Sequence, residues 1–258
     1  MSRHWAGLDR ELDAWAEAGR TATFWWRDDD AAERTRALDR LLDLAERTGT
    51  PIGIAVIPAA ATSALVSHLD VHPRTTILQH GWAHVNHALA GAKRAELGGD
   101  RPIEAVRNDI ARGRSRLREL LGRPAPPYLV PPWNRIAPEV ASGLPSLGFR
   151  GLSTYGPRSA GRKCGLARVN CHIDPIDWRG TRRYVGEERA VQEVVRHLRA
   201  RLERRLDPDE PTGLLTHHLV ADDGCWEFAE ALLERTTRHG AARWLTPEAA
   251  FLTDSGAA

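Results

Sequence analysis

Residues 24–30 read Phe-Trp-Trp-Arg-Asp-Asp-Asp, an aromatic run that ends in three carboxylates. Aromatic residues favour β-strands and Asp disfavours them, so this segment predicts a strand that delivers acidic groups into a site at its carboxyl end. Neighbouring carboxylates repel one another when ionised, and a divalent cation would relieve that repulsion. The alternative is a solvated acidic turn that caps a following helix, because Asp is a favoured N-cap residue.

The remainder of the chain alternates predicted strands with predicted helices. Continuous apolar or β-branched runs predict strands at 52–57, 75–79, 128–130, 151–154, 166–169 and 213–216. Helical spacing of apolar residues predicts helices at 1–20, 38–45, 61–69, 103–120, 137–147, 191–202 and 222–238. Repeated strand–helix units imply a parallel sheet with helices outside it, and we expect a barrel. No glycine-rich phosphate loop follows the first strand, which argues against an open dinucleotide-binding sheet.

Composition limits the possible classes of protein. The chain has 258 residues, 42% of them apolar, and no linker-like segment, so we predict a single domain over residues 1–258. A net charge of +2 provides no field that would attract nucleic acid. The amino terminus lacks an apolar leader, and the longest nearly apolar stretch, residues 52–61, is far shorter than the ~20 residues of a membrane span. We therefore expect a soluble, cytoplasmic protein of undetermined oligomeric state.

The three cysteines, Cys164, Cys171 and Cys225, have no CxxC spacing. Neither a disulfide framework nor a thiolate metal site is indicated, and we expect buried free thiols.

Polar residues follow the predicted strands at several points along the chain. In a βα barrel the carboxyl ends of the strands share one face, so these groups should converge there. Buried His and Asp side chains at successive strand ends need a metal, a partner or water. The groups concerned are Asp28-Asp29, His80 with His84, Pro131 to Asn134, Asp174 with Asp177-Trp178, and His217-His218.

The segment His80-Gly81-Trp82-Ala83-His84 is the strongest local signal. An HxxxH spacing can present two imidazoles to one cation, and a carboxylate from another strand end, here Asp29, completes a set that leaves coordination positions open. Alone, such a spacing more often marks surface histidines. His87 also fits a ligand pair with His84, and we interpret it as a supporting or structural residue.

These motifs, in this order, resemble those of the polysaccharide deacetylase family, also called the NodB-homology domain, over most of the chain. The family's first motif, Thr-Phe-Asp-Asp-Gly, is similar to residues 26–30, which implies that Asp28 is the catalytic base and Asp29 a metal ligand. Its second motif, His-(Ser/Thr)-x-x-His, corresponds to His80 and His84 and implies that both bind the metal. The resemblance also implies an incomplete parallel βα barrel of about seven strands.

Three further motifs have counterparts, of which the third and fourth are loose and the fifth, together with the first and second, is specific. Arg-x-Pro-aromatic resembles residues 130–133, an Asp-x-x-Asp-Trp segment resembles 174–178, and Leu-x-His resembles 215–217. An amine is a poor leaving group, so an acid must protonate the nitrogen, and the family register assigns this role to His217. The substrate-binding candidates are Trp133, Asn134, Asp177, Trp178 and His218.

The chain departs from the family pattern at three positions. Val130 replaces an arginine that orients the base, so the base is either oriented by another cation, Arg27 or Arg135, or less activated. Asp30 replaces a glycine and adds a third carboxylate. His218 replaces an aspartate that commonly follows the final histidine, so it is open which imidazole faces the site.

The function that these residues predict is metal-dependent hydrolysis of an N-acyl bond. The expected reaction is deacetylation of an N-acetylated sugar or glycan precursor, with one divalent cation, zinc, as cofactor. The expected partner is this small-molecule or carbohydrate substrate. Two alternatives remain: a metal-dependent amidohydrolase acting on a cyclic amide or imide, and a non-catalytic binding protein on the same fold.

Overall fold

The computed structural model describes residues 3–159, 161–163 and 165–252. The strands are β1 Ala22–Ala31, β2 Ile52–Val56, β3 Thr75–His80, β4 Tyr128–Val130, β5 Gly151–Leu152, β6 Arg162–Lys163, β7 Leu166–Arg168, β8 Thr212–Thr216 and β9 Ala242–Trp244. The helices are α1 Arg3–Glu17, α2 Arg36–Thr48, α3 Ser63–Asp70, α4 Ile103–Leu121, α5 Pro138–Gly143, α6 Glu187–Leu202, α7 Asp223–Arg238 and α8 Pro247–Leu252. Short 3₁₀ turns, η1 Pro132–Asn134 and η2 Leu144–Leu147, follow β4 and α5.

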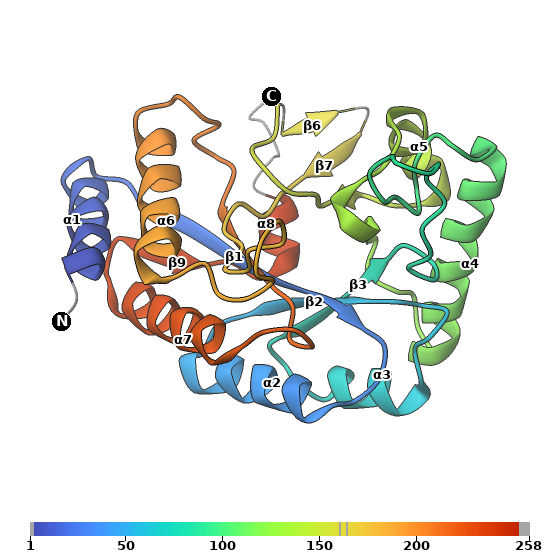
Figure 1. Ribbon diagram of the computed structural model, residues 1–258, viewed down its shortest axis with the longest axis horizontal. Helices are drawn as coiled ribbons and strands as arrows, with labels where there is room; N and C mark the ends of the chain where they lie inside the picture. The colour runs from blue at the N-terminus through green and yellow to red at the C-terminus, as the bar shows by residue number, and fades with distance from the viewer. Residues whose placement is uncertain (1–2, 160, 164, 253–258) are drawn as a thin grey trace.

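The strands form one sheet that curls into an incomplete barrel (Figure 1). Along the order β7-β5-β4-β3-β2-β1-β8 every neighbouring pair is parallel. The barrel is incomplete because, in the described part of the chain, its edge strands β7 and β8 do not pair with each other. The segment after β7 reaches β8 through the isolated bridge from Ile173 to Leu214. The predicted fold class, a parallel βα barrel of about seven strands, is confirmed.

Alternation along β1 separates two layers of the core. Phe24 and Trp26 pack outward against the helices, in a cluster with Leu8 of α1 and Leu232 of α7. Trp25 points the other way, into an inner cluster that lines the barrel. Successive strand residues face opposite sides of a sheet, so this aromatic run is buried on both faces.

Three short elements were not predicted from the sequence. β6 adds an antiparallel strand to β7, and β9 pairs with the start of β1. α8 packs beneath the inner cluster, where Phe251 stacks on Tyr128 with ring centroids 4.3 Å apart and meets Trp25 edge-on at 5.9 Å. Tyr128 begins β4, so α8 covers the amino-terminal side of the barrel and leaves the carboxyl ends of the strands for the site.

The cysteine prediction is confirmed where it can be examined: Cys171 and Cys225 are buried free thiols, and Cys164 lies outside the described residues. Among the helices in the described ranges, none combines the length and apolar character needed to cross a membrane.

Candidate metal centre and active site

A β-bulge shapes the carboxyl end of β1. Asp28 lies opposite Ile54 of β2, and Ala31 lies opposite Val56, so β1 holds one more residue than its partner over this interval. Asp30 has a φ of 75°, in the left-handed region that non-glycine residues rarely adopt. A bulge re-aims side chains at a strand end, and here it turns Asp30 toward the site.

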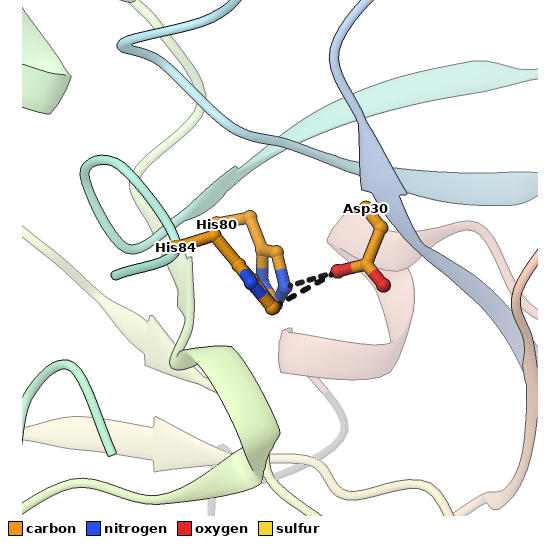
Figure 2. Close-up of side chains that lie close together, drawn as sticks. All are labelled: Asp30, His80 and His84. Atoms are coloured by element: carbon orange, nitrogen blue, oxygen red, sulfur yellow. Dashed lines mark hydrogen bonds and ion pairs between the residues drawn. The ribbon is translucent and has the colours of Figure 1, made fainter. Parts of the chain in front are cut away.

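Asp30, His80 and His84 form a compact cluster (Figure 2). Asp30 Oδ1 lies 3.1 Å from His80 Nε2 and 3.2 Å from His84 Nε2. Burial alone would raise the pKa of Asp30, but its hydrogen bonds with the two histidines hold that pKa well below its usual range. The cluster contains Asp30 rather than Asp29, the residue that the sequence pattern predicts as the carboxylate ligand.

The backbone and a neighbouring ring hold the two imidazoles in place. The His80 Nδ1 atom lies 3.0 Å from the Val130 carbonyl oxygen, which directs Nε2 toward Asp30. Val130, where the family has arginine, therefore helps to orient His80 through its backbone carbonyl oxygen. Trp133 packs against His84 with ring centroids 4.3 Å apart.

Backbone strain is concentrated around this cluster. Besides Asp30, the residues His84, Trp133 and Asn134 have φ values of 56°, 55° and 58°. Each such conformation in a non-glycine residue costs about 1–3 kcal/mol and persists where the surrounding structure enforces it, most often at functional sites.

Asp29 is paired with Arg27, two residues earlier on the same face of β1. Arg27 donates from Nη2 to Asp29 Oδ2 at 2.9 Å, and both side chains are buried. A second contact, 2.9 Å between Arg27 Nε and Asp29 Oδ1, is an ion pair without hydrogen-bond alignment. Apart from this ion pair with Arg27, Asp29 Oδ1 has no hydrogen-bond partner among the described residues.

Arg27 is held by residues from two other strand ends. Its guanidinium donates to Asn134 Oδ1 and to Ser153 Oγ, each at 2.6 Å. Burial alone would lower the pKa of Arg27, but the Asp29 carboxylate raises it above its ordinary value, so the guanidinium remains charged. Of the two cations that the sequence suggested as substitutes for the missing arginine, Arg27 lies beside a carboxylate of the site, whereas Arg135 donates to the Arg94 carbonyl oxygen.

Asp28 lies on the opposite face of β1, away from this cluster. Its carboxylate accepts hydrogen bonds from Thr216 Oγ1 at 2.7 Å and from the His218 backbone N–H at 3.0 Å. Its Oδ1 lies 2.5 Å from His218 Nδ1, and both side chains are fully buried. Burial alone would lower the pKa of His218, but Asp28 raises it. The predicted base Asp28 and the predicted substrate-binding residue His218 therefore form a pair that joins β1 to β8.

His217 lies at the mouth of the site, beside Trp178. The Trp178 ring meets the imidazole edge-on, with centroids 4.7 Å apart, and its Nε1 donates to Asp174 Oδ2 at 2.7 Å. Burial raises the pKa of Asp174, and the electrostatic attraction of His217 opposes that rise. Electrostatic attraction from His217 also contributes to lowering the pKa of Asp30.

The predicted substrate-binding residues fall into two groups. Trp133 and Trp178 flank the site, beside His84 and His217 respectively, and Trp178 is 41% exposed. Asn134 instead holds Arg27, and Asp177 accepts from the Thr181 backbone N–H at 3.4 Å within its own loop. His87 is exposed and does not belong to the cluster of Asp30, His80 and His84.

Neither a protein-family model nor a curated protein matches this chain. Solved structures do. A proposed polysaccharide deacetylase from Mycobacterium smegmatis is 17% identical with a TM-score of 0.64, over 90% of this chain and 88% of that chain. A family 4 acetyl xylan esterase from Clostridium thermocellum, in complex with a cobalt ion, is 13% identical with a TM-score of 0.56, over 89% and 90%. The peptidoglycan deacetylase PdaC from Bacillus subtilis is 11% identical with a TM-score of 0.56, over 91% of each chain. The chain therefore has the fold of the polysaccharide deacetylases.

Proposed function

We propose that this chain is a metal-dependent hydrolase that removes an acyl group from nitrogen, with an N-acetylated sugar or glycan precursor as its substrate. One observation carries the proposal: the bulge in β1 places Asp30 against His80 and His84 while Asp29 lies next to it, held by Arg27. A binding protein would need neither an available carboxylate nor a histidine acid beside such a cluster.

The donor set of Asp30, His80 and His84 fits a divalent cation, and we propose zinc. Two imidazole nitrogens and a carboxylate oxygen are common zinc ligands. Ligands bound tetrahedrally at 2.0–2.1 Å lie about 3.3 Å apart, close to the 3.1 and 3.2 Å that separate Asp30 Oδ1 from the two Nε2 atoms. The chemistry that such a cation supplies when bound is Lewis acidity toward an acyl carbonyl and toward water.

Asp29 is the residue that we assign as the general base. Its Oδ1 has no hydrogen-bond partner in the described part of the chain and can accept a proton from an attacking water. Arg27 fixes the orientation of this carboxylate and compensates its charge. This moves the resemblance by one residue: Asp29-Asp30, rather than Asp28-Asp29, would correspond to the aspartate pair of the first motif, and Ala31 to its glycine.

His217 is the residue that we assign as the general acid. It would donate a proton to the leaving nitrogen, which an amine requires before it can depart. Trp178 packs edge-on against the imidazole, and Asp174 lies close enough to it for electrostatic attraction. Trp133 and Trp178 would provide apolar walls for a sugar ring.

The substrate class is supported by the solved structures of the same fold, described as a peptidoglycan deacetylase and an acetyl xylan esterase. The direct test is to load the metal-free protein with zinc and to measure free amine and released acid from N-acetylated sugars, with cyclic amides and imides as a parallel panel. We expect amine release from the N-acetylated sugars only, and only with metal. Hydrolysis of the cyclic compounds alone would contradict the proposed substrate class, and no hydrolysis in either panel would contradict the proposed activity.

We predict that His217→Ala lowers kcat by roughly 10²-fold or more while it leaves metal content unchanged, the usual effect of removing a positioned proton donor. The measurements are kcat for an N-acetylated sugar and the metal content of the purified variant.

His218→Ala is the matched control for this prediction. It leaves the buried carboxylate of Asp28 unpaired, so we expect it to destabilise the fold by about 3–5 kcal/mol, measured by denaturant unfolding. Near-normal kcat in His217→Ala, together with a large loss of kcat in folded His218→Ala, would indicate that His218 rather than His217 is the general acid.

A further inference from the structure

Glu96 is a buried carboxylate that neither the motifs nor the proposed mechanism uses. It is only 1% exposed, and it lies in the long connection between β3 and α4. A carboxylate is seldom buried this completely unless hydrogen bonds satisfy it. Its partners are the backbone amides of the histidine loop: Trp82 N–H donates to Oε2 at 3.0 Å, and Ala83 N–H donates to Oε1 at 2.7 Å.

The loop that Glu96 holds carries the two proposed histidine ligands at its ends. Gly81 has a φ of 53° and His84 a φ of 56°, so the chain turns through the left-handed region at both ends of this short segment. The Gly81 carbonyl oxygen accepts from Gln79 Nε2 at 3.0 Å. Glu96 and Gln79 together satisfy three backbone groups of this loop, namely the N–H groups of Trp82 and Ala83 and the carbonyl oxygen of Gly81.

Gly81 is matched to Glu96 by packing. A Cβ atom at Gly81 would lie only 2.0 Å from Glu96 Oε2 and 2.6 Å from the Pro132 ring. At position 81 the family motif has serine or threonine. Here the residue is glycine, and the space of that side chain is occupied by the carboxylate of Glu96.

The backbone on both sides of Glu96 is fixed. Before it, His87 N–H donates to the Ala95 carbonyl oxygen at 2.9 Å. After it, Leu97 forms a bridge with Ile136, and Ala137 N–H donates to the Leu97 carbonyl oxygen at 2.8 Å. Glu96 thus acts on the histidine loop from a rigid support rather than from a free loop.

We propose that Glu96 is a positioning residue that sets the metal affinity of the site, because it holds the backbone between His80 and His84 in the conformation that brings both Nε2 atoms together. This inference rests on the proposed metal centre. Residues that orient metal ligands typically change metal affinity by 10- to 100-fold when they are replaced.

The test is a titration of the metal-free protein with Co²⁺ in competition with a chromophoric chelator, with the visible Co²⁺ spectrum as a second readout. In Glu96→Gln one amide N–H would face the new NH₂ group instead of an acceptor. We expect Co²⁺ affinity to fall by about 10- to 100-fold and the spectrum to change, because the ligand geometry is relaxed.

Glu210→Gln is the matched control. Glu210 is 2% exposed and also accepts from two backbone amides, those of Arg158 at 3.0 Å and Asn170 at 3.1 Å, outside the metal cluster. We expect it to lower the stability of the metal-free protein while leaving Co²⁺ affinity and spectrum unchanged. If Glu96→Gln does not fold, Glu96→Asp, which withdraws the carboxylate by one methylene, is titrated in its place with the same expectation.

Three outcomes would overturn the inference. Unchanged Co²⁺ affinity in the folded Glu96 variant would remove the role of Glu96 and leave the metal centre intact. Equal losses of Co²⁺ affinity in the Glu96 and Glu210 variants would show that lower stability alone weakens Co²⁺ binding. No Co²⁺ binding by the wild-type chain would instead reject the proposed metal centre, and the inference with it.

Discussion

Asp30→Ala should remove the bound metal and abolish activity. Asp30 Oδ1 is the one carboxylate oxygen within the cluster formed with His80 Nε2 and His84 Nε2 in the described part of the chain. Even residues that only support ligands change affinity 10- to 100-fold, so loss of a ligand should exceed about 10²-fold. The measurement is metal content after gel filtration, together with competitive titration of the metal-free variant.

Asp28→Asn controls for a change of charge at this end of β1. It alters the buried pair with His218 on the other face of the strand, so it should lower stability and leave the metal content of the folded fraction unchanged. Stoichiometric metal in Asp30→Ala, with loss of metal in Asp29→Asn, would instead support the ligand assignment made from the sequence.

The fold could be predicted because its signals are repeated along the chain. Continuous apolar runs such as β2, buried at every position, alternate with amphipathic helices such as α2, and short connections restrict such units to a parallel sheet. β6 and β9 were not predicted, because neither has the apolar or β-branched run that marked the equally short β4, β5 and β7. β6 reads Arg-Lys and β9 reads Ala-Arg-Trp, so both depend on the neighbours with which they pair.

The positions of Asp28 and Asp29 could have been predicted from strand alternation, whereas the position of Asp30 could not. Alternation starting from the inward-facing Trp25 places Arg27 and Asp29 on the inner face and Asp28 on the outer face, so the position of Asp28 could have been predicted. The bulge at Asp30 could not have been predicted from the sequence. It depends on pairing with β2 and requires a positive φ in a residue that does not favour it.

The replacement for the missing arginine follows from the same geometry. Residues two apart on a strand share a face, so Arg27 lies directly beside Asp29 and needs no contribution from β4. His80 and His84, by contrast, were predicted from the sequence as a pair because they follow one buried strand with HxxxH spacing. What the sequence did not indicate was Glu96, because its contacts are with backbone amides and depend on the path of the loop.

Asp29→Asn should lower kcat by about 10²- to 10⁴-fold, the range for removing a general base, while the bound metal stays stoichiometric. The amide fits the same space and can still accept from Arg27, but it cannot take a proton from water. The measurements are kcat for the N-acetylated substrate, metal content, and denaturant unfolding to confirm that the fold is intact.

Arg27→Lys tests whether Asp29 must be oriented by the guanidinium as well as being present. Lysine keeps the positive charge but lacks the planar fork with which Arg27 contacts both oxygens of Asp29, as well as Asn134 and Ser153. We expect kcat to fall, by less than in Asp29→Asn, with metal content unchanged. If kcat were wild-type in both variants, Asp29 would not be the base. If it fell only in Asp29→Asn, the carboxylate would be the base without needing the Arg27 fork to orient it.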